Sequence, residues 1–141
     1  MQIHVPQDIQ SSNLRIFTPG VYDIQLADIF YGTSNTGNPK QTFKYVVLSE
    51  TEGVDDPDYI STVGENLLET FSLQPQALFR LNDVYNDVCK ENLPMGDYTP
   101  EEFTAVVESA LVGTVFRAVL DVEPDNRGNE RMVVRKRSVA D

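Results

Sequence analysis

Apolar and polar residues alternate clearly in the segment 21–30. Asp23 and Gln25 are interleaved with an apolar set that shares one face, namely Tyr22, Ile24, Leu26 and Phe30. A period of two predicts a strand with one buried face. The segment 32–40, GTSNTGNPK, is dense in turn-forming residues and predicts the loop of a strand pair.

Further segments rich in β-branched and aromatic residues, or alternating in polarity, predict four more strands. These are Thr42–Ser49, Tyr59–Leu73 with a bend near Gly64, the stretch from Gly113 to Val122, and Glu130–Arg137 after the turn 123–129. A short strand at Ile3–Val5 is a further option.

Between the third and fourth strands the period changes to that of a helix. Over 75–92, Pro75 suits a first helical turn, and apolar residues then recur at steps of three and four from Ala77 to Val88. A second helix is expected from Thr99, because Thr99-Pro100-Glu101-Glu102 combines a capping hydroxyl, a proline and a glutamate three residues on.

The expected order is three strands, two helices and two strands. This is the order of a five-stranded OB-fold barrel with a helical insertion between strands three and four. The spacing also permits an α+β sandwich. A chain of 141 residues is about one domain long, so we expect residues 1–141 to form a single OB-fold-like domain.

The net charge of −11 is unevenly distributed. Residues 1–110 hold 5 basic and 17 acidic side chains, whereas residues 111–141 hold 6 basic and 5 acidic ones. A binding face depends on the local potential, so the acidic total does not exclude a nucleic-acid partner.

Composition and motifs argue against several classes of protein. The single cysteine, Cys89, excludes an internal disulfide, and no secretory signal or membrane span is recognisable, which predicts a cytoplasmic protein. His4 stands alone and no catalytic motif occurs, so we expect neither an enzyme nor a cofactor. Asp55, Asp56 and Asp58 lack the spacing of a calcium loop, so no metal site is expected.

Several stretches together resemble a known group. Gly20-Val21-Tyr22-Asp23-Ile24 is followed by a loop with Thr36-Gly37-Asn38-Pro39 and an apolar strand ending at Glu50. A helix at Ala77–Lys90 then precedes Leu111-Val112-Gly113-Thr114-Val115-Phe116 and a strand pair. Over residues 20–137 this resembles a group of small OB-fold proteins encoded by bacteriophages, in which a leucine–any residue–glycine step like Leu111–Gly113 precedes the fourth strand.

The resemblance implies binding of single-stranded DNA during phage DNA replication or recombination, in the cytoplasm of a host cell. The resemblance leaves open whether the chain also binds replication or recombination proteins, or forms a homo-oligomer. Many single-strand binders end in an acidic tail, whereas this chain ends with VRKRSVAD, which puts recruitment by a tail in doubt unless the acidic loop 50–58 replaces it.

The basic residues of the last strand are the first candidate ligands for a DNA backbone. Arg131, Arg135 and Arg137 alternate with Met132 and Val134 and are expected on one face, with Arg117 of the preceding strand beside them. An arginine-lined groove suits phosphates. Basic residues on an edge strand can equally serve only to block aggregation.

Aromatic rings for base stacking are the second group of candidates. Tyr31 and Tyr59, near strand ends, are preferred. Tyr45 and its neighbour Lys44 are also candidate ligands, although the core is the more natural place for a ring on this strand. Lys40 in the first loop and Arg127 in the turn 123–129 could contact phosphates, or simply belong to flexible turns.

Two other functions fit the same sequence. An OB-fold barrel can be a structural or assembly component of a virion. The net charge of −11 also suits an acidic protein-interaction module or a DNA mimic.

Overall fold

The computed structural model describes residues 2, 16–50, 63–125 and 127–140. Strands β1 (Gly20–Thr33), β2 (Pro39–Glu50) and β3 (Asn66–Ser72) come first. The 3₁₀ turn η1 (Pro75–Ala77) and helices α1 (Leu78–Cys89) and α2 (Pro100–Leu111) follow, and then strands β4 (Val115–Pro124) and β5 (Glu130–Val139). The expected order of elements is therefore present within the described residues.

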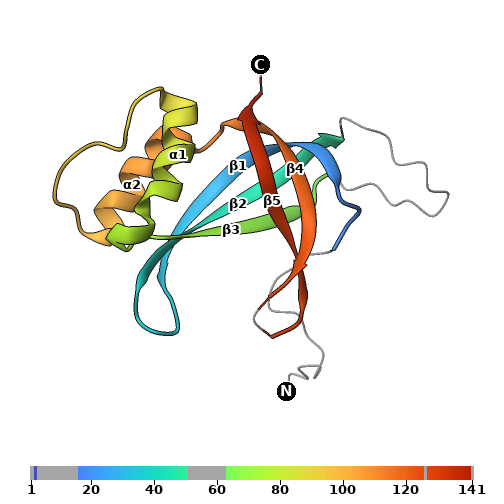
Figure 1. The fold of residues 1–141 in the computed structure, drawn as a ribbon, viewed down its shortest axis with the longest axis horizontal. Coiled ribbons are helices and arrows are strands. Elements are labelled where there is room, and N and C mark those ends of the chain that lie inside the picture. The colour runs from blue at the N-terminus through green and yellow to red at the C-terminus, as the bar shows by residue number, and fades with distance from the viewer. Residues whose placement is uncertain (1, 3–15, 51–62, 126, 141) are drawn as a thin grey trace.

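The five strands form one antiparallel sheet in the order β3-β2-β1-β4-β5. β1 lies at the centre, where it pairs with β2 on one side and with β4 on the other. Although β3 and β5 are at opposite ends of this order, they contact each other, because β4 and β5 curl across β1–β3 (Figure 1). The fold is mainly β, an open five-stranded sheet with two helices that is consistent with a barrel-like shape.

Both helices lie together at one side of the sheet (Figure 1), where α1 contacts β3 and β5, and α2 contacts β1. The start of α2 follows the sequence prediction, since the Thr99 hydroxyl accepts a hydrogen bond from the Glu102 N–H (3.2 Å) and Pro100 is the first helical residue. Cys89, at the end of α1, is half-buried.

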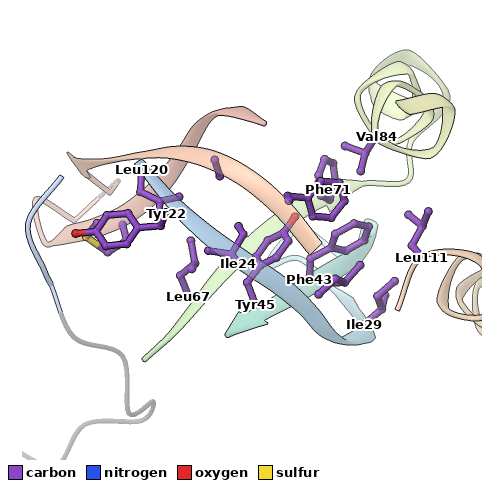
Figure 2. Packing of buried hydrophobic residues seen from close by; sticks show 14 of the residues in the cluster. Tyr22, Ile24, Ile29, Phe43, Tyr45, Leu67, Phe71, Val84, Leu111 and Leu120 are labelled. Carbon is purple, nitrogen blue, oxygen red and sulfur yellow. The ribbon is translucent and has the colours of Figure 1, made fainter. Parts of the chain in front are cut away.

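The core runs from the middle of the sheet to the helices. In Figure 2, Phe43 and Phe71 face each other below Val84 of α1, while Tyr22 and Leu120 lie at the other end of the cluster. The centroids of the Phe43 and Phe71 rings are 4.7 Å apart. One continuous core therefore joins the helices to the sheet.

A bulge in β1 corrects one expectation about the core. The pairing with β2 shifts between Leu26 and Asp28, so that Ala27 is an extra residue in β1. Beyond this bulge the alternation is reversed. Ile29 is buried, whereas Phe30, which the sequence pattern assigned to the buried face, is exposed (45% of its surface).

A second bulge corrects the expected face of the last strand. Val119 pairs with Lys136 and Leu120 pairs with Val134, which leaves Arg135 as the extra residue in β5. Arg137 therefore points inward, opposite the buried Ala118, while Arg131 and Arg135 point outward. The three arginines do not share one face.

The sequence predicts the third strand over Tyr59–Leu73, but Val63 and Gly64 form a turn before the strand instead of a bend within it, while the other boundaries differ by only a few residues. β3 begins at Asn66, after Gly64, whose φ of +89° is a conformation that favours glycine. The strand option at Ile3–Val5, the acidic residues Asp55, Asp56 and Asp58, and Tyr59 all lie outside the described residues. Within the described ranges, no helix is both long and apolar enough to cross a membrane.

Candidate nucleic-acid interface

The outer face of β1–β3 combines an exposed ring with two lysines. β2 points its even-numbered side chains outward, since Gln41, Phe43 and Tyr45 are buried between them. We call this surface the lysine face and define it by outward side chains of three neighbouring strands: Phe30, Lys40, Thr42, Lys44, Leu68 and Thr70.

The register of the three strands places the ring between the lysines. Phe30 pairs with Thr42, which pairs with Thr70 on β3. Lys40 and Lys44 lie on either side of Thr42 along β2. Directly paired side chains are about 5 Å apart, so Phe30 lies beside Thr42, with Lys40 and Lys44 as its diagonal neighbours on either side. Leu68, opposite Lys44, adds a second exposed apolar side chain.

The charges of these lysines are available to a ligand. Among the residues that the structure describes, no carboxylate lies within 4.0 Å of the Lys40 or Lys44 ammonium group. Asp28 pairs with Lys44 in the strand register, but its carboxylate accepts a hydrogen bond from the Ile29 N–H (2.8 Å). The lysine face can therefore attract an anion without first breaking an ion pair.

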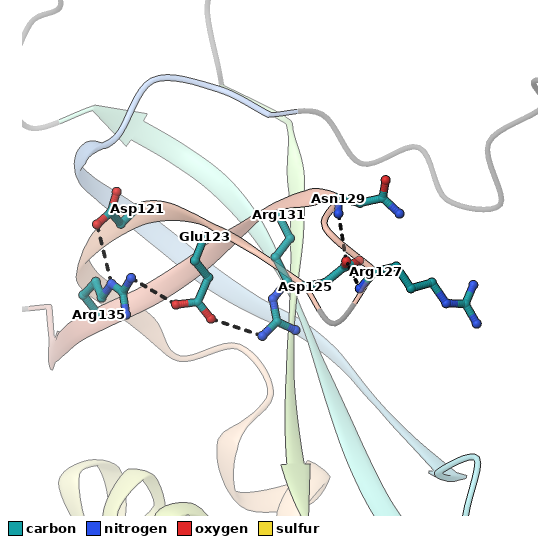
Figure 3. A network of polar contacts seen from close by, with 7 residues as sticks. All are labelled: Asp121, Glu123, Asp125, Arg127, Asn129, Arg131 and Arg135. Carbon is teal, nitrogen blue, oxygen red and sulfur yellow. Dashed lines mark hydrogen bonds and ion pairs between the residues drawn. The ribbon is translucent and has the colours of Figure 1, made fainter.

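The arginines of β4 and β5 have acidic neighbours. Arg135 binds Asp121 (3.5 Å) and Glu123 (3.0 Å), and Arg131 binds the other oxygen of Glu123 (3.2 Å), as Figure 3 shows. Arg117 binds Asp23 at 3.2 Å. Phosphates that approach these three arginines would meet carboxylates beside each guanidinium, so the surface is far less basic than the sequence of β5 indicates.

Arg137 and Tyr45 do not face a ligand but belong to a buried cluster that holds the sheet together. Arg137 on β5 makes a two-pronged ion pair with Glu69 on β3 and donates a hydrogen bond to the Tyr45 hydroxyl (2.6 Å). Tyr45 itself donates to Glu69 (2.7 Å). The side chains of Arg137 and Glu69 are only 13% and 11% exposed. This trio, the seam cluster, joins β3 to β5 where backbone pairing between them is missing from the sheet order.

Burial of Tyr45 corrects its assignment as a stacking ring. The residue has no exposed surface and lies in the core (Figure 2), so a base cannot reach its ring. Burial and the charge of Glu69 raise the pKa of Tyr45 well above its ordinary value, although Arg137 opposes them. The neutral phenol therefore persists and can donate to Glu69.

The other expected ligands are dispersed. Tyr31 is exposed (38%) and, as the residue after Phe30 in β1, points to the opposite side of the strand. Arg127 is exposed at the β4–β5 turn, where its backbone N–H donates to Asp125 (2.8 Å; Figure 3). Of the expected set, only Lys40 and Lys44 lie on the lysine face within the described residues, whereas Arg131 and Arg135 lie together at Glu123 and Tyr45 and Arg137 lie together in the seam cluster.

Phe30 is the residue that the sequence interpretation missed. Strict alternation put it in the core, and only an extra residue in β1 turns it outward. The sequence ADIF at 27–30 gives one usable signal, because an alanine and an aspartate in succession interrupt the apolar alternation at the bulge.

Comparisons with known proteins leave the function to be argued from the residues. No model of a known protein family matches the chain, and no curated protein matches it either. Within the described part of the chain, no three histidine, cysteine, aspartate or glutamate side chains are grouped so that they could hold a metal ion.

Proposed function

We propose that this chain is an OB-fold protein that binds single-stranded DNA on its lysine face, without reading the base sequence. The single observation that carries the proposal is the exposed Phe30 ring between two lysines without ion-pair partners among the described residues. An aromatic ring can stack on any base, while ammonium groups neutralise the phosphates beside it.

The position of this face supports the OB-fold part of the proposal. The strand order β3-β2-β1-β4-β5, with β3 and β5 in contact and the helices following β3, agrees with a five-stranded OB barrel. In such barrels the surface of strands two and three and the first hairpin loop commonly bind oligonucleotides. The lysine face covers β2 and β3, includes Phe30 near the end of β1, and reaches Lys40 beside that loop. A role in phage DNA replication or recombination follows from the resemblance of residues 20–137 and is part of the same proposal.

Removal of the Phe30 ring tests the proposal directly. The probe is a fluorescent oligothymidylate of about 30 nucleotides, longer than the roughly 4–16 nucleotides that one OB fold covers. We expect wild-type protein to bind it at low salt, and Phe30→Ala to weaken binding about five- to 150-fold, the effect of losing about 1–3 kcal/mol of stacking. Fluorescence anisotropy gives both dissociation constants.

Phe79 provides the matched control. It is an exposed phenylalanine (62%) on α1, away from the three strands of the lysine face, so Phe79→Ala should leave affinity unchanged within about twofold. Equal losses for both variants would refute a specific role of Phe30. A wild-type protein that ignores the oligonucleotide at low salt would refute the function, and preference for RNA or duplex DNA would reassign the ligand.

A further inference from the structure

A groove next to the connector between α1 and α2 is lined by residues of that connector, by both helices and by Pro39, the neighbour of Lys40 on β2. Its volume is about 540 Å³, in the range of sites that hold a large side chain or a small ligand. Most of its walls are apolar, with Leu73, Leu78, Leu93, Met95, Tyr98 and Phe103 as the main contributors. The rest of the lining comes from the start of β2 at Pro39, from Leu73 just after β3, and from the starts of both helices.

The connector is held in place, so the groove exists without a ligand. The Leu93 N–H donates to the Asn82 side chain on α1 (2.8 Å), and Asn92 accepts a bond from the same side chain (3.2 Å). The rings of Tyr98 and Phe103 are 5.6 Å apart at the other end of the connector. Preformed walls lower the entropic cost of binding.

The rim of the groove exposes apolar surface to solvent. Met95, at the edge of the groove, is 97% exposed, the most exposed of the large apolar side chains in the described residues. Methionine is flexible and polarisable, and it is over-represented on surfaces that accept varied partner side chains. The groove therefore suits a bulky apolar side chain of another molecule.

The charge around the groove selects the kind of partner. Residues 75–112 contain seven acidic and two basic side chains, and all nine are exposed. Asp97 lines the groove itself, and Glu101 and Glu102 adjoin its lining residues Pro100 and Phe103. A negative rim repels nucleic acid and acidic peptides, and it attracts lysine and arginine.

We propose that this groove binds a segment of a partner protein in which a bulky apolar side chain is flanked by basic residues. The groove adjoins the lysine face at Pro39 but shares none of the residues that define that face, so the proposal goes beyond nucleic-acid binding and gives the chain a second, protein-binding surface. The apolar side chain fills the groove, and the flanking cations meet Asp97, Glu101 and Glu102.

Three synthetic peptides test the proposal in the absence of DNA. The first has the sequence KKLFKK, the second replaces LF by SS, and the third replaces every lysine by glutamate. In ¹⁵N-resolved NMR titrations of the full chain, we expect KKLFKK to shift the amides of the connector and of the first turn of α2. The serine peptide and the glutamate peptide should each bind at least about fivefold more weakly.

Exposed positions provide variants that leave the core intact. Met95→Ser and Asp97→Lys should each weaken KKLFKK about fivefold or more, while their matched controls Phe79→Ser and Asp87→Lys, exposed on α1 outside the groove lining, should change its affinity less than about twofold. Met95→Ser should bind oligothymidylate like the wild type, which separates this result from the nucleic-acid proposal.

Several results would overturn the inference. These are equal binding of the glutamate peptide, amide shifts confined to residues outside the groove, absence of shifts at millimolar peptide, or equal effects of the paired variants. Concentration-dependent shifts of the connector without any peptide, together with a dimer in sedimentation velocity, would mean that a second copy of the chain occupies the groove instead.

Discussion

Arg137 shows how a single buried charge is stabilised in this protein. Burial alone would lower the pKa of its guanidinium, but hydrogen bonds with Glu69 and Tyr45 raise it overall. The charged form is thus held by partners from two other strands, Glu69 on β3 and Tyr45 on β2. The seam cluster therefore keeps the buried guanidinium charged and also links β3 to β5 through side chains.

Loss of one member of the buried ion pair should destabilise the fold strongly. We expect Arg137→Met to lower the free energy of unfolding by about 3–5 kcal/mol, because Glu69 would remain buried without its cation. The double variant Arg137→Met/Glu69→Leu should recover much of that loss, since no buried charge remains. Urea unfolding followed by circular dichroism measures both values.

An exposed pair gives the comparison. Arg131 and Glu123 are 59% and 31% exposed, so Arg131→Met should change stability by at most about 1 kcal/mol. If Arg137→Met and Arg131→Met had equal effects, the seam cluster would have no special role in stability.

Alkaline pH should weaken the fold through Tyr45. Its pKa is raised in the folded state, so its contribution to stability is complete below the unfolded pKa of about 10 and declines as the pH rises above it. Between about pH 9 and pH 11 the free energy of unfolding should fall more steeply for the wild type than for Tyr45→Phe, which has no phenol to ionise. Urea unfolding at both pH values measures the free energy of unfolding of each protein. An equal decrease for the wild type and Tyr45→Phe would contradict this prediction.

At the scale of elements, the sequence predicts which segments are strands and helices but not where bulges reverse the faces of strands such as β1 and β5. The order of elements and the capped start of α2 follow from local signals such as Thr99 and Pro100. The faces of Phe30 and Arg137 depend on bulges at Ala27 and Arg135. A bulge is a property of a strand pair, so the alternation within one strand does not reveal it.

Deletion of the bulge residue tests this explanation. Without Arg135, every residue of β5 opposes one residue of β4, so Lys136 can still pair with Val119 and Arg137 with Ala118, and Arg137 keeps facing Glu69. We expect the deletion to cost about 1 kcal/mol or less, because only the exposed ion pairs of Arg135 are lost. A loss of about 3–5 kcal/mol, as for Arg137→Met, would mean that Arg135 is not an extra residue and that the deletion turns Arg137 outward. The control Arg135→Ala keeps the backbone and removes only exposed ion pairs, so it should cost about 1 kcal/mol or less.

At the scale of the whole molecule, the two lysines without ion-pair partners and the excess of acidic side chains on the helices lie on different elements. The lysine face has two cations without ion-pair partners in the described ranges, whereas the helical side carries seven acids against two bases. Sequence analysis found Lys40 and Lys44 but gave more weight to the arginines of β5. That weighting failed to anticipate Asp121 and Glu123, which are distant from Arg135 in sequence and adjacent to it across the β4–β5 pair.

Salt dependence should distinguish the two basic surfaces. Each phosphate contact on a single strand contributes about 0.7 to the slope of log affinity against log salt concentration. We therefore expect Lys44→Gln to reduce the slope by about 0.7, and Arg135→Gln to leave it nearly unchanged because Arg135 is already neutralised by Asp121 and Glu123. Anisotropy titrations at several salt concentrations measure the slopes, and the reverse ranking would move the binding surface to β4–β5.

The central place of β1 has a consequence for how the chain is made. β1 and β2 are joined by a short loop and can pair early, but β4 is synthesised only after β3 and both helices, although it must pair with β1 from Gly20 to Gln25. Until then one edge of β1 has no strand beside it, and such an edge can pair with another chain. Because distant contacts also form slowly, a nascent chain stalled before β4 should aggregate more readily than the finished protein.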